Sequence, residues 1–310
     1  MHDRIVTLTM NPTVDIASDA DAVRPIRKVR TRDETFDPGG GGVNVSRVLR
    51  ELGADTLAVV AAGGVSGRLL EELLDQGDVP RVSIPTTART RISYTVHDLG
   101  ARLEYRFVPE GPVLAEREWR AALDALDASQ SGWIVASGSL PRGVPEDFYA
   151  QAADHASRRN RRFVLDTSGP PLRAALGRSL ALIKPSRSEC ETLMGTALET
   201  PEAQDAAALR LARGGTAELV AVTLGHEGAI LAEPGGMLLR LPALDVPAVG
   251  AVGAGDSFLA AMVFALSRGD SPREAFALGM AAGAAAVMRP GTAHPRAADV
   301  EALRRRIGPV

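Results

Sequence analysis

The stretch Val252-Gly253-Ala254-Gly255-Asp256-Ser257-Phe258 decides the predicted fold. Two glycines and an alanine precede an apolar run from Phe258 to Leu266, and Gly269 follows that run. Such a pattern is typical of a tight turn that leads into a buried helix. The first amides of a helix lack partners inside the helix and carry the positive end of its dipole. We therefore expect an anion to bind against the small residues that begin this helix.

Asp256 lies in the first turn of the predicted helix. Beside amides that bind a phosphate, a carboxylate is well placed to take a proton from an attacking hydroxyl group. The alternative is that Asp256 only caps the helix and that the glycines only form the turn. Both interpretations remain open from this stretch alone.

A second glycine run, Gly39-Gly40-Gly41-Gly42, precedes Val43-Asn44-Val45-Ser46-Arg47 and a helix predicted to end at about Leu52. Four glycines lose much backbone entropy on folding, so their presence indicates backbone that must lie close to a ligand. Asn44 offers both donors and acceptors, which suits a polyhydroxylated ligand. A flexible loop is the alternative interpretation of the glycines.

The composition is that of an α/β enzyme. The 310 residues suffice for one large domain or two small ones, and a net charge of −3 implies no bulk attraction to nucleic acid or to an anionic membrane. The single cysteine, Cys190, fits a reducing compartment, and the five histidines show no metal-ligand spacing. The N-terminus runs directly into a strand without a signal peptide, and no apolar run approaches the ~20 residues of a membrane span. We expect a cytoplasmic protein.

Strands and helices alternate along most of the chain. The first strand is predicted from Arg4 to Met10, and a helix capped by Ser66 runs to Gln76. From residue 113 onward the regular alternation predicts a doubly wound, mainly parallel sheet flanked by helices. Ligands bind at the carboxyl ends of the strands in such a sheet. The residues predicted there are Ser139, Asp166, Lys184, Thr223 and Gly225.

More polar strands indicate a small separate sheet. Arg91 to His97 and Arg102 to Val108 form a predicted hairpin through Asp98-Leu99-Gly100-Ala101. In the extended segment 17–37, Lys28, Arg30 and Arg32 alternate, which would place them on one face of a strand. We predict a single α/β domain over residues 1–310, with lid strands inserted at about 12–38 and 88–110.

Together the two glycine motifs are specific, and the chain resembles the PfkB (ribokinase-like) family of sugar kinases. The resemblance covers essentially the whole chain. It is strengthened by four further stretches similar to the sugar-phosphate branch of that family: Asn11-Pro12 with Asp15, Tyr105-Arg106-Phe107, Ser137-Gly138-Ser139-Leu140-Pro141 and Thr223-Leu224-Gly225. The resemblance implies a ribokinase-like fold, the use of ATP and Mg²⁺ with K⁺ as a further candidate ion, and a sugar-phosphate substrate.

The glycine run favours one substrate within that branch. Glycine occupies all of 39–42, after Phe36-Asp37-Pro38, where 1-phosphofructokinases and tagatose-6-phosphate kinases usually carry a lysine. The resemblance therefore implies ATP-dependent phosphorylation of fructose 6-phosphate to fructose 1,6-bisphosphate. The alternatives are 1-phosphofructokinase or tagatose-6-phosphate kinase activity and, in another class, a catalytically weak sugar-phosphate sensor.

The resemblance also assigns roles residue by residue. Asp256 is the expected general base, in an anion hole formed by Gly253, Ala254 and Gly255. Sugar hydroxyls are expected at Asp15, Gly40, Gly41 and Asn44. The substrate phosphate is expected at Ser139, Arg91 and Arg106, the two arginines having no acidic partner. Lys28 and Arg30 are expected to reach the substrate of a neighbouring subunit across a homodimer formed by the lids. The nucleotide is expected at Lys184, Thr223, Gly225 and Gly228.

Two positions depart from the family pattern. The family's Asn-x-x-Glu segment, which organises magnesium through water, reads Ser186-Arg187-Ser188-Glu189, so Glu189 is retained as the expected contact to metal-bound water. The threonine usual before the second motif is Ala251. The pattern G-x-x-x-x-G-K-[ST] does not occur, which excludes a P-loop kinase.

Overall fold

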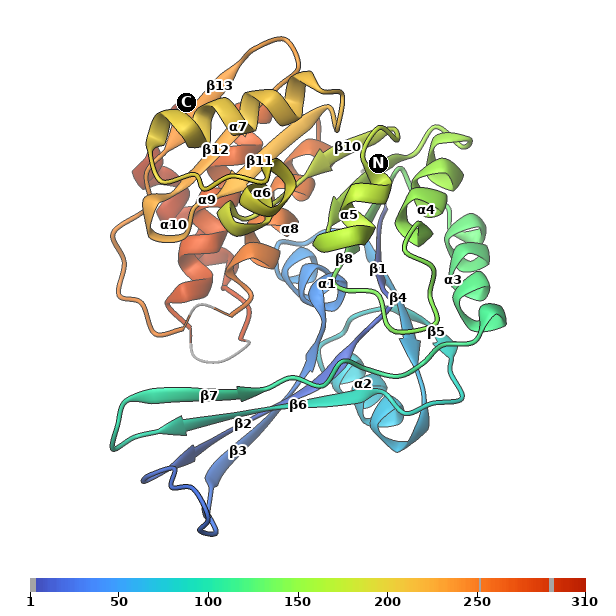
Figure 1. Ribbon diagram of the computed structural model, residues 1–310, viewed down its shortest axis with the longest axis vertical. Coiled ribbons are helices and arrows are strands. Elements are labelled where there is room, and N and C mark those ends of the chain that lie inside the picture. The colour runs from blue at the N-terminus through green and yellow to red at the C-terminus, as the bar shows by residue number, and fades with distance from the viewer. Residues whose placement is uncertain (1–3, 251, 290–292) are drawn as a thin grey trace.

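The computed structural model describes residues 4–250, 252–289 and 293–310, in which the strands form two sheets (Figure 1). The large sheet has the order β13-β12-β11-β10-β9-β8-β1-β4-β5. In this spatial order, all strands from β11 to β5 run parallel to one another. Their bounds are β1 (Ile5–Thr9), β4 (Thr56–Ala62), β5 (Arg81–Pro85), β8 (Trp133–Ser137), β9 (Arg162–Asp166), β10 (Leu180–Ile183), β11 (Leu219–Thr223), β12 (Ala229–Ala232) and β13 (Leu238–Leu241). The last two strands are antiparallel.

Helices cover both faces of the large sheet (Figure 1). One face carries α3 (Glu116–Ala128), α4 (Phe148–Ser157), α5 (Gly169–Ala175), α6 (Arg187–Met194) and α7 (Pro201–Arg213). The other carries α1 (Gly41–Glu51), α2 (Gly64–Gln76), α8 (Ala254–Ser267) and α9 (Pro272–Val287), with α10 (Ala297–Ile307) packed against α9. The prediction of a doubly wound α/β fold is confirmed.

The central strand β1 shows why the sheet needs two helical layers. Val6 and Leu8 point into the core beneath α3 to α7, whereas Ile5 points into the core beneath α1 and α8. All three side chains are at most 1% exposed. A parallel strand buried on both faces is rich in apolar residues, and in Ile5–Thr9 the only polar side chains are the buried Thr7 and Thr9.

The strand order reverses at β1. From β1 the chain adds β4 and β5 on one side, and it then crosses to β8 and continues outward on the other. The carboxyl ends of β1 and β8 therefore border a crevice at a topological switch point, where open α/β sheets bind ligands. Of the predicted functional residues, Gly41 and Ser139 lie at this edge.

The small sheet, which we call the lid, stands off the body (Figure 1). It contains β2 (Thr13–Ala20), β3 (Arg32–Gly39), β6 (Arg91–Asp98) and β7 (Leu103–Phe107) in the order β3-β2-β6-β7. The predicted hairpin of β6 and β7 is confirmed, and β2 pairs with β6 in parallel. The lid strands occupy residues 13–39 and 91–107.

One prediction about the lid is wrong. Lys28 and Arg30 lie exposed in the loop between β2 and β3, at the free end of the lid, rather than on one face of a strand (Figure 1). The loop turns at residues 25–27, where Ile26 has a φ of 66°, and β3 begins only at Arg32. A residue outside the ladder loses the strict alternation on which the prediction depended.

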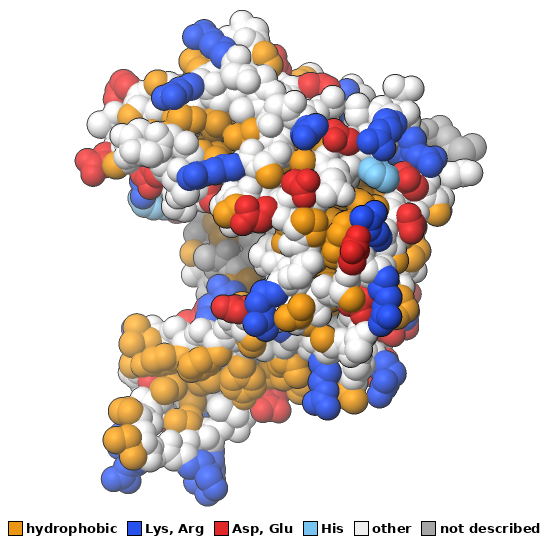
Figure 2. All heavy atoms as spheres, turned by 45° about the vertical axis from the view of Figure 1, so that its right-hand side comes forward, with side chains coloured by type: hydrophobic (Ala, Val, Ile, Leu, Met, Phe, Trp, Pro, Cys, Tyr) orange, Lys and Arg blue, Asp and Glu red, His pale blue; other side chains and the backbone are white. Residues whose placement is uncertain are grey.

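The lid has one polar and one apolar face. The register of its four strands puts Asp15, Asp37, Ser93 and Arg106 on the same polar face. The opposite face carries the exposed apolar side chains Phe36, Ile92, Leu103 and Phe107. Hydrophobic side chains gather over the lid in Figure 2. Val96 lies on the same face but is only 7% exposed.

Among the described residues, no helix has the length and apolar character needed to cross a membrane.

Substitution of Gly42 tests how closely α1 packs on β1. A Cβ at Gly42 would lie 2.6 Å from the carbonyl oxygen of Leu8 and 2.5 Å from the Oγ1 of Thr9. We expect Gly42→Ala to lower the free energy of unfolding by about 1–3 kcal/mol, although alanine favours helix, because backbone must shift. The matched control is Gly283→Ala in α9, whose Cβ would have its nearest atom at 3.4 Å. Chemical denaturation of both variants makes the comparison, and equal stabilities would contradict the packing argument.

Candidate active site

Helix α8 begins where the sequence predicted it. Gly253 is the N-cap residue with φ 76° and ψ 0°, a left-handed conformation that favours glycine. The first intrahelical bond runs from the amide of Ser257 to the carbonyl of Gly253 at 2.9 Å. The Gly253 cap contributes no side-chain bond, so the amides of Ala254 and Gly255 are left for a ligand, as the anion-hole prediction requires.

Asp256 lies in the first turn of α8 and is held from α1. Asn44 Nδ2 donates a hydrogen bond of 2.8 Å to Asp256 Oδ2. The carboxylate lies deep beneath the surface, yet the floor of a cavity leaves it partly accessible. Burial, and then the negative charge of Asp166, raise its pKa to about 7, while Asn44 and Lys184 act in the opposite direction. A carboxyl group that titrates near neutral pH suits proton transfer.

A buried ion pair lies beside Asp256. Lys184 Nζ is 3.2 Å from Asp166 Oδ1, and the two side chains are 7% and 14% exposed. Burial disfavours the ammonium form of Lys184, but Asp166, Asp256 and Glu189 outweigh it and raise the pKa of the lysine. Lys184 therefore stays protonated and brings a fixed positive charge beneath the start of α8.

These groups surround a cavity of about 270 Å³ at the carboxyl ends of the strands. It is lined by Gly41, Ser137, Gly138, Ser139, Asp166, Thr167, Ser168, Glu189 and Asp256. Of the predicted site residues, the structure brings together Gly41, Ser139, Glu189 and Asp256 around this cavity. Hydroxyls, carboxylates and exposed backbone make it suited to a polar, phosphorylated ligand.

The first glycine run packs closely against the body. A Cβ at Gly41 would lie 2.2 Å from the hydroxyl of Ser137, and one at Gly40, whose φ is 108°, would lie 2.8 Å from the side chain of Thr9. These glycines are therefore required by packing, in addition to the close approach to a ligand that we predicted. Asn44 Oδ1 is buried and has no hydrogen-bond partner among the described residues, which leaves it available to a sugar hydroxyl.

Asp15 faces a second, small cavity beneath the polar face of the lid. This cavity, of about 20 Å³, is also lined by Ser93, Arg106 and Val252. Burial raises the pKa of Asp15, against a hydrogen bond from Ser93 and the charges of Arg91 and Arg106. The volume suffices for about one water molecule, so a sugar here requires the lid to move away from Val252.

Arg91 and Arg106 have different surroundings. Arg91 donates to the carbonyls of Asn11 and Pro109, both at 2.9 Å, and its Nε is buried without a partner among the described residues. Arg106 Nε lies 3.7 Å from Glu104 Oε1, so the expectation that neither arginine has an acidic neighbour is wrong. Side chains two residues apart on one strand share a face, which is why they meet.

The predicted nucleotide residues lie at the carboxyl end of β11. The amide of Thr223 bonds to the carbonyl of Pro185 at 3.0 Å. Gly225 has a φ of 62°, and nothing lies within 4 Å of where its Cβ would be, which permits the approach of a ligand. Gly228 differs, because its Cβ would lie 2.1 Å from the carbonyl oxygen of Leu241. The packing of the β12–β13 hairpin alone therefore requires glycine there.

A comparison with known proteins identifies the family. The model of the pfkB family carbohydrate kinase matches residues 8–299. The chain belongs to this family.

Individual pfkB kinases are similar over nearly the full length. The ATP-dependent 6-phosphofructokinase isozyme 2 of Mycobacterium tuberculosis is 43% identical over 300 residues, which cover 96% of this chain and 88% of that protein. Two crystal structures of phosphofructokinase-2 from Escherichia coli, each 33% identical, cover 99% of this chain and are themselves covered completely. The structure in complex with potassium has a TM-score of 0.95, and the one in complex with fructose-6-phosphate has 0.93.

The departure at Ser186 has a structural counterpart. Ser186 is the N-cap residue of α6, where its hydroxyl accepts a bond of 3.3 Å from the amide of Glu189, and Glu189 Oε2 accepts one of 2.7 Å from the amide of Ser186. This reciprocal capping box fixes the start of α6 and orients the glutamate. Ala251, the second departure, lies outside the described residues.

Two residues of the site were assigned no role from the sequence, although Asp166 was predicted to lie at the carboxyl end of its strand. Asn11 donates 3.1 Å to Ser139 Oγ and 2.9 Å to the carbonyl of Glu110, and its Oδ1 is buried without a partner in the described chain. Asp166 forms the ion pair with Lys184 and accepts 3.3 Å from Ser137 Oγ. A polar residue directly after a buried strand was the available signal for both. Lys28 and Arg30, at the far end of the lid, are not brought to this site within one chain.

The environment of Asp256 gives a test by activity and pH. If Asp256 is the base, Asp256→Asn should lower kcat by about 10²–10⁴-fold. Because the base must be ionised, kcat/KM of the parent should fall as the pH drops through about 7, the pKa of Asp256. The residual activity of the variant, measured over the same range, is the control for titration of the substrate phosphate. A parent profile that matches that of the variant would exclude Asp256 as the titrating group.

Proposed function

We propose that this protein transfers the γ-phosphoryl group of ATP to fructose 6-phosphate, yielding fructose 1,6-bisphosphate and ADP. The observation that carries the proposal is the arrangement at the start of α8, where a buried carboxylate with a pKa of about 7 lies beside helix-start amides. The 43% identity to a 6-phosphofructokinase supports the choice of substrate. A sugar-phosphate sensor would have no need of a base poised near neutral pH.

The residues at the start of α8 and around the sugar site have distinct proposed roles in the reaction. Asp256 Oδ accepts the proton of the sugar hydroxyl that attacks, while the amides of Ala254 and Gly255 stabilise negative charge on the group in transfer. Asn44 orients Asp256 through Nδ2 and accepts from a sugar hydroxyl through its free Oδ1. Asp15, with Gly40 and Gly41, binds the remaining hydroxyls. Closure of the lid excludes water from the site, which limits hydrolysis of ATP.

The substrate phosphate is proposed to bind at Ser139, Arg91 and Arg106. Asn11 connects Ser139 to Arg91. Its side-chain amide donates to the hydroxyl of Ser139, and its main-chain carbonyl accepts a bond from Arg91. Lys28 and Arg30 of a second subunit would complete this anion site from the free end of the partner's lid. A planar guanidinium group suits a phosphate because it donates two parallel bonds.

The nucleotide and its metal ion fit the residues present. Mg-ATP supplies the phosphoryl group when bound; Lys184, Thr223, Gly225 and Gly228 would hold the nucleotide, and Glu189 a metal-bound water. Among the described residues, no group of three or more histidine, cysteine or acidic side chains is arranged as a metal site. That suits Mg²⁺, which keeps several waters and binds through few protein carboxylates. K⁺ is proposed as a further ion, since a related structure is in complex with potassium.

The deciding experiment compares three substrates. Production of ADP is measured at fixed Mg-ATP with fructose 6-phosphate, fructose 1-phosphate and tagatose 6-phosphate. We expect the highest kcat/KM with fructose 6-phosphate. A preference for either other sugar phosphate would show that the all-glycine run was over-interpreted, and binding without turnover of any of them would favour the sensor.

Arg106 provides a test of the phosphate site. Arg106→Ala should raise the KM for the sugar phosphate by at least tenfold, because a charge-assisted bond to phosphate is lost, and should leave the KM for ATP within about twofold. The matched control is Arg102→Ala at the turn before β7, which is expected to change neither constant. Equal increases in both KM values would make Arg106 a structural residue of the lid.

We propose that the apolar lid face forms a homodimer. Phe107 is 60% exposed and Leu103 is 56% exposed, and exposed apolar patches mark interaction sites. In sedimentation at micromolar concentration, the parent should be a dimer and Phe107→Glu a monomer with a raised KM for the sugar phosphate. Val65→Glu on α2, where Val65 is 66% exposed, is the control and should remain dimeric. A fully active monomeric parent would refute the interface.

A further inference from the structure

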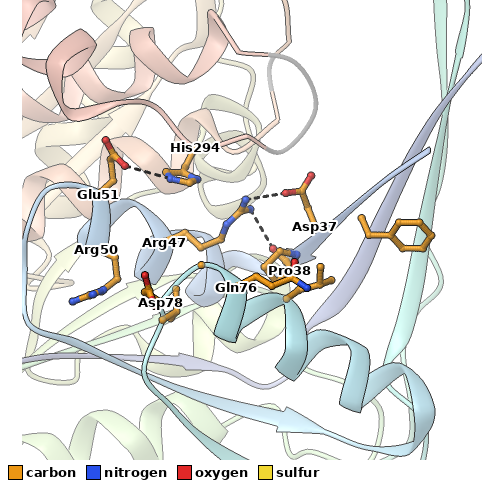
Figure 3. A pocket seen from close by; sticks show the side chains of 12 residues that line it. Asp37, Pro38, Arg47, Arg50, Glu51, Gln76, Asp78 and His294 are labelled. Carbon is orange, nitrogen blue, oxygen red and sulfur yellow. Dashed lines mark hydrogen bonds and ion pairs between the residues drawn. The ribbon is translucent and has the colours of Figure 1, made fainter. Parts of the chain in front are cut away.

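Asp37 separates two cavities at the root of the lid. On one side it lines the small cavity that also contains Asp15 and Arg106. On the other side it lines a cavity of about 360 Å³ between α1, the end of α2 and β3, which His294 also borders (Figure 3). None of the proposed chemistry takes place in this larger cavity, which we call the rear cavity. Asp37 thus lies between the candidate sugar site and the rear cavity and lines both.

Arg47 holds Asp37 from the rear cavity. Arg47 Nη2 donates to Asp37 Oδ1 at 2.9 Å, and Nη1 donates to the carbonyl of Pro38 at 3.3 Å. Figure 3 shows the guanidinium group reaching from α1 to β3, with both bonds drawn. The Arg47 side chain is only 10% exposed and that of Asp37 29%. The pair is partly withdrawn from water, and loss of Arg47 would leave the carboxylate of Asp37 without this partner.

The charge of Asp37 acts directly on the sugar site. Asp37 pairs in register with Asp15 across β2 and β3, so the two carboxylates share the polar face of the lid. Burial is the first cause that raises the pKa of Asp15, and the charge of Asp37 adds to it. Two adjacent carboxylates oppose the approach of an anionic sugar phosphate. Arg91 and Arg106 offset the charge of Asp15 from the neighbouring lid strands, and Arg47 behind β3 offsets that of Asp37.

Arg47 also connects the lid to the catalytic carboxylate. It lies three residues after Asn44 on α1, and Asn44 holds Asp256. One helix therefore positions the proposed base through Asn44 and the edge strand of the lid through Arg47. Because β3 leads straight into α1 through the glycine run, the bond to Asp37 fixes the strand at the point where the lid leaves the body.

We propose that Arg47 is a positioning residue for the sugar phosphate: from the rear cavity it neutralises Asp37 and holds it beside Asp15. Arg47 touches none of the reacting atoms. The inference rests on the proposed function, since it assigns a further specificity-determining residue to the same site.

The test separates charge from structure. Arg47→Ala should raise the KM for fructose 6-phosphate about tenfold and leave the KM for ATP within about twofold. The double variant Arg47→Ala with Asp37→Asn should return the KM for the sugar phosphate to within about threefold of the parent, because the uncompensated charge is gone. If the double variant binds no better than the single variant, or if both KM values rise equally, the proposal is wrong.

The rear cavity permits a rescue experiment. Removal of the Arg47 side chain would extend the cavity to Asp37, so methylguanidinium added at millimolar concentration should enter and lower the raised KM of Arg47→Ala. The double variant, which has no carboxylate to pair, should not respond. Arg50→Ala is the matched control, because Arg50 lines the same cavity and is exposed. Its KM should equal that of the parent and should be insensitive to methylguanidinium; rescue of all variants alike would overturn the proposal.

Two further measurements keep the outcome decisive. Should Arg47→Ala fail to fold, Arg47→Gln removes the charge but keeps hydrogen-bond donors, and an unchanged KM for fructose 6-phosphate in that variant would refute the inference. Calorimetric binding of fructose 6-phosphate to parent and variants gives the same comparison without turnover. An inactive parent would then overturn the proposed function alone, whereas equal binding by parent and Arg47→Ala would overturn the role of Arg47 alone.

Discussion

The structure of the site depends on a carboxylate that is largely, but not fully, withdrawn from water. Asp256 begins a buried helix, and burial raises its pKa to about 7. Without Lys184 and Asn44 the ionised form would be disfavoured further, because both groups lower that pKa. Lys184 in turn remains charged because Asp166 pairs with it at 3.2 Å. Asp166 keeps Lys184 charged, and the charge of Lys184 in turn favours the ionised form of Asp256. A largely buried acid can therefore still ionise, as a general base must.

The same compensation of charge recurs at the lid. Asp15 and Asp37 lie side by side on its polar face, and they are balanced by arginines from three elements, Arg91 on β6, Arg106 on β7 and Arg47 on α1. The body and the lid therefore each present a carboxylate to the proposed sugar site, and cations lie beside or behind each carboxylate. Acidic groups that recognise hydroxyls can coexist with a phosphorylated substrate only when their own charge is balanced in this way.

Local patterns predicted the parts of this protein that local forces determine. The turn at Gly253 and the helix after it could be predicted, because a left-handed glycine and an apolar run act within a few residues. The helix α5 (Gly169–Ala175) and the strand β5 (Arg81–Pro85) were not predicted, since two prolines at the start of the former and the short length of both weaken the periodic signal. Ser66 was wrongly predicted as a cap; it lies within α2, and its hydroxyl bonds to the carbonyl of Thr90 at 2.6 Å.

Contacts between distant segments explain what the sequence could not provide. Arg47 and Asp37 are ten residues apart, but only the fold at the root of the lid brings them into contact. The hydrogen bond between Asn44 and Asp256 joins residues 212 positions apart. Glycine is the clearest case, because the residue type alone cannot say whether a ligand or the protein needs the space. Gly225 leaves room for a ligand, whereas Gly228 has a carbonyl 2.1 Å from the missing Cβ, although both were predicted to serve the nucleotide. A glycine motif therefore identifies where the chain does without a side chain, and only the surrounding atoms show whether the protein fills that space or leaves it open.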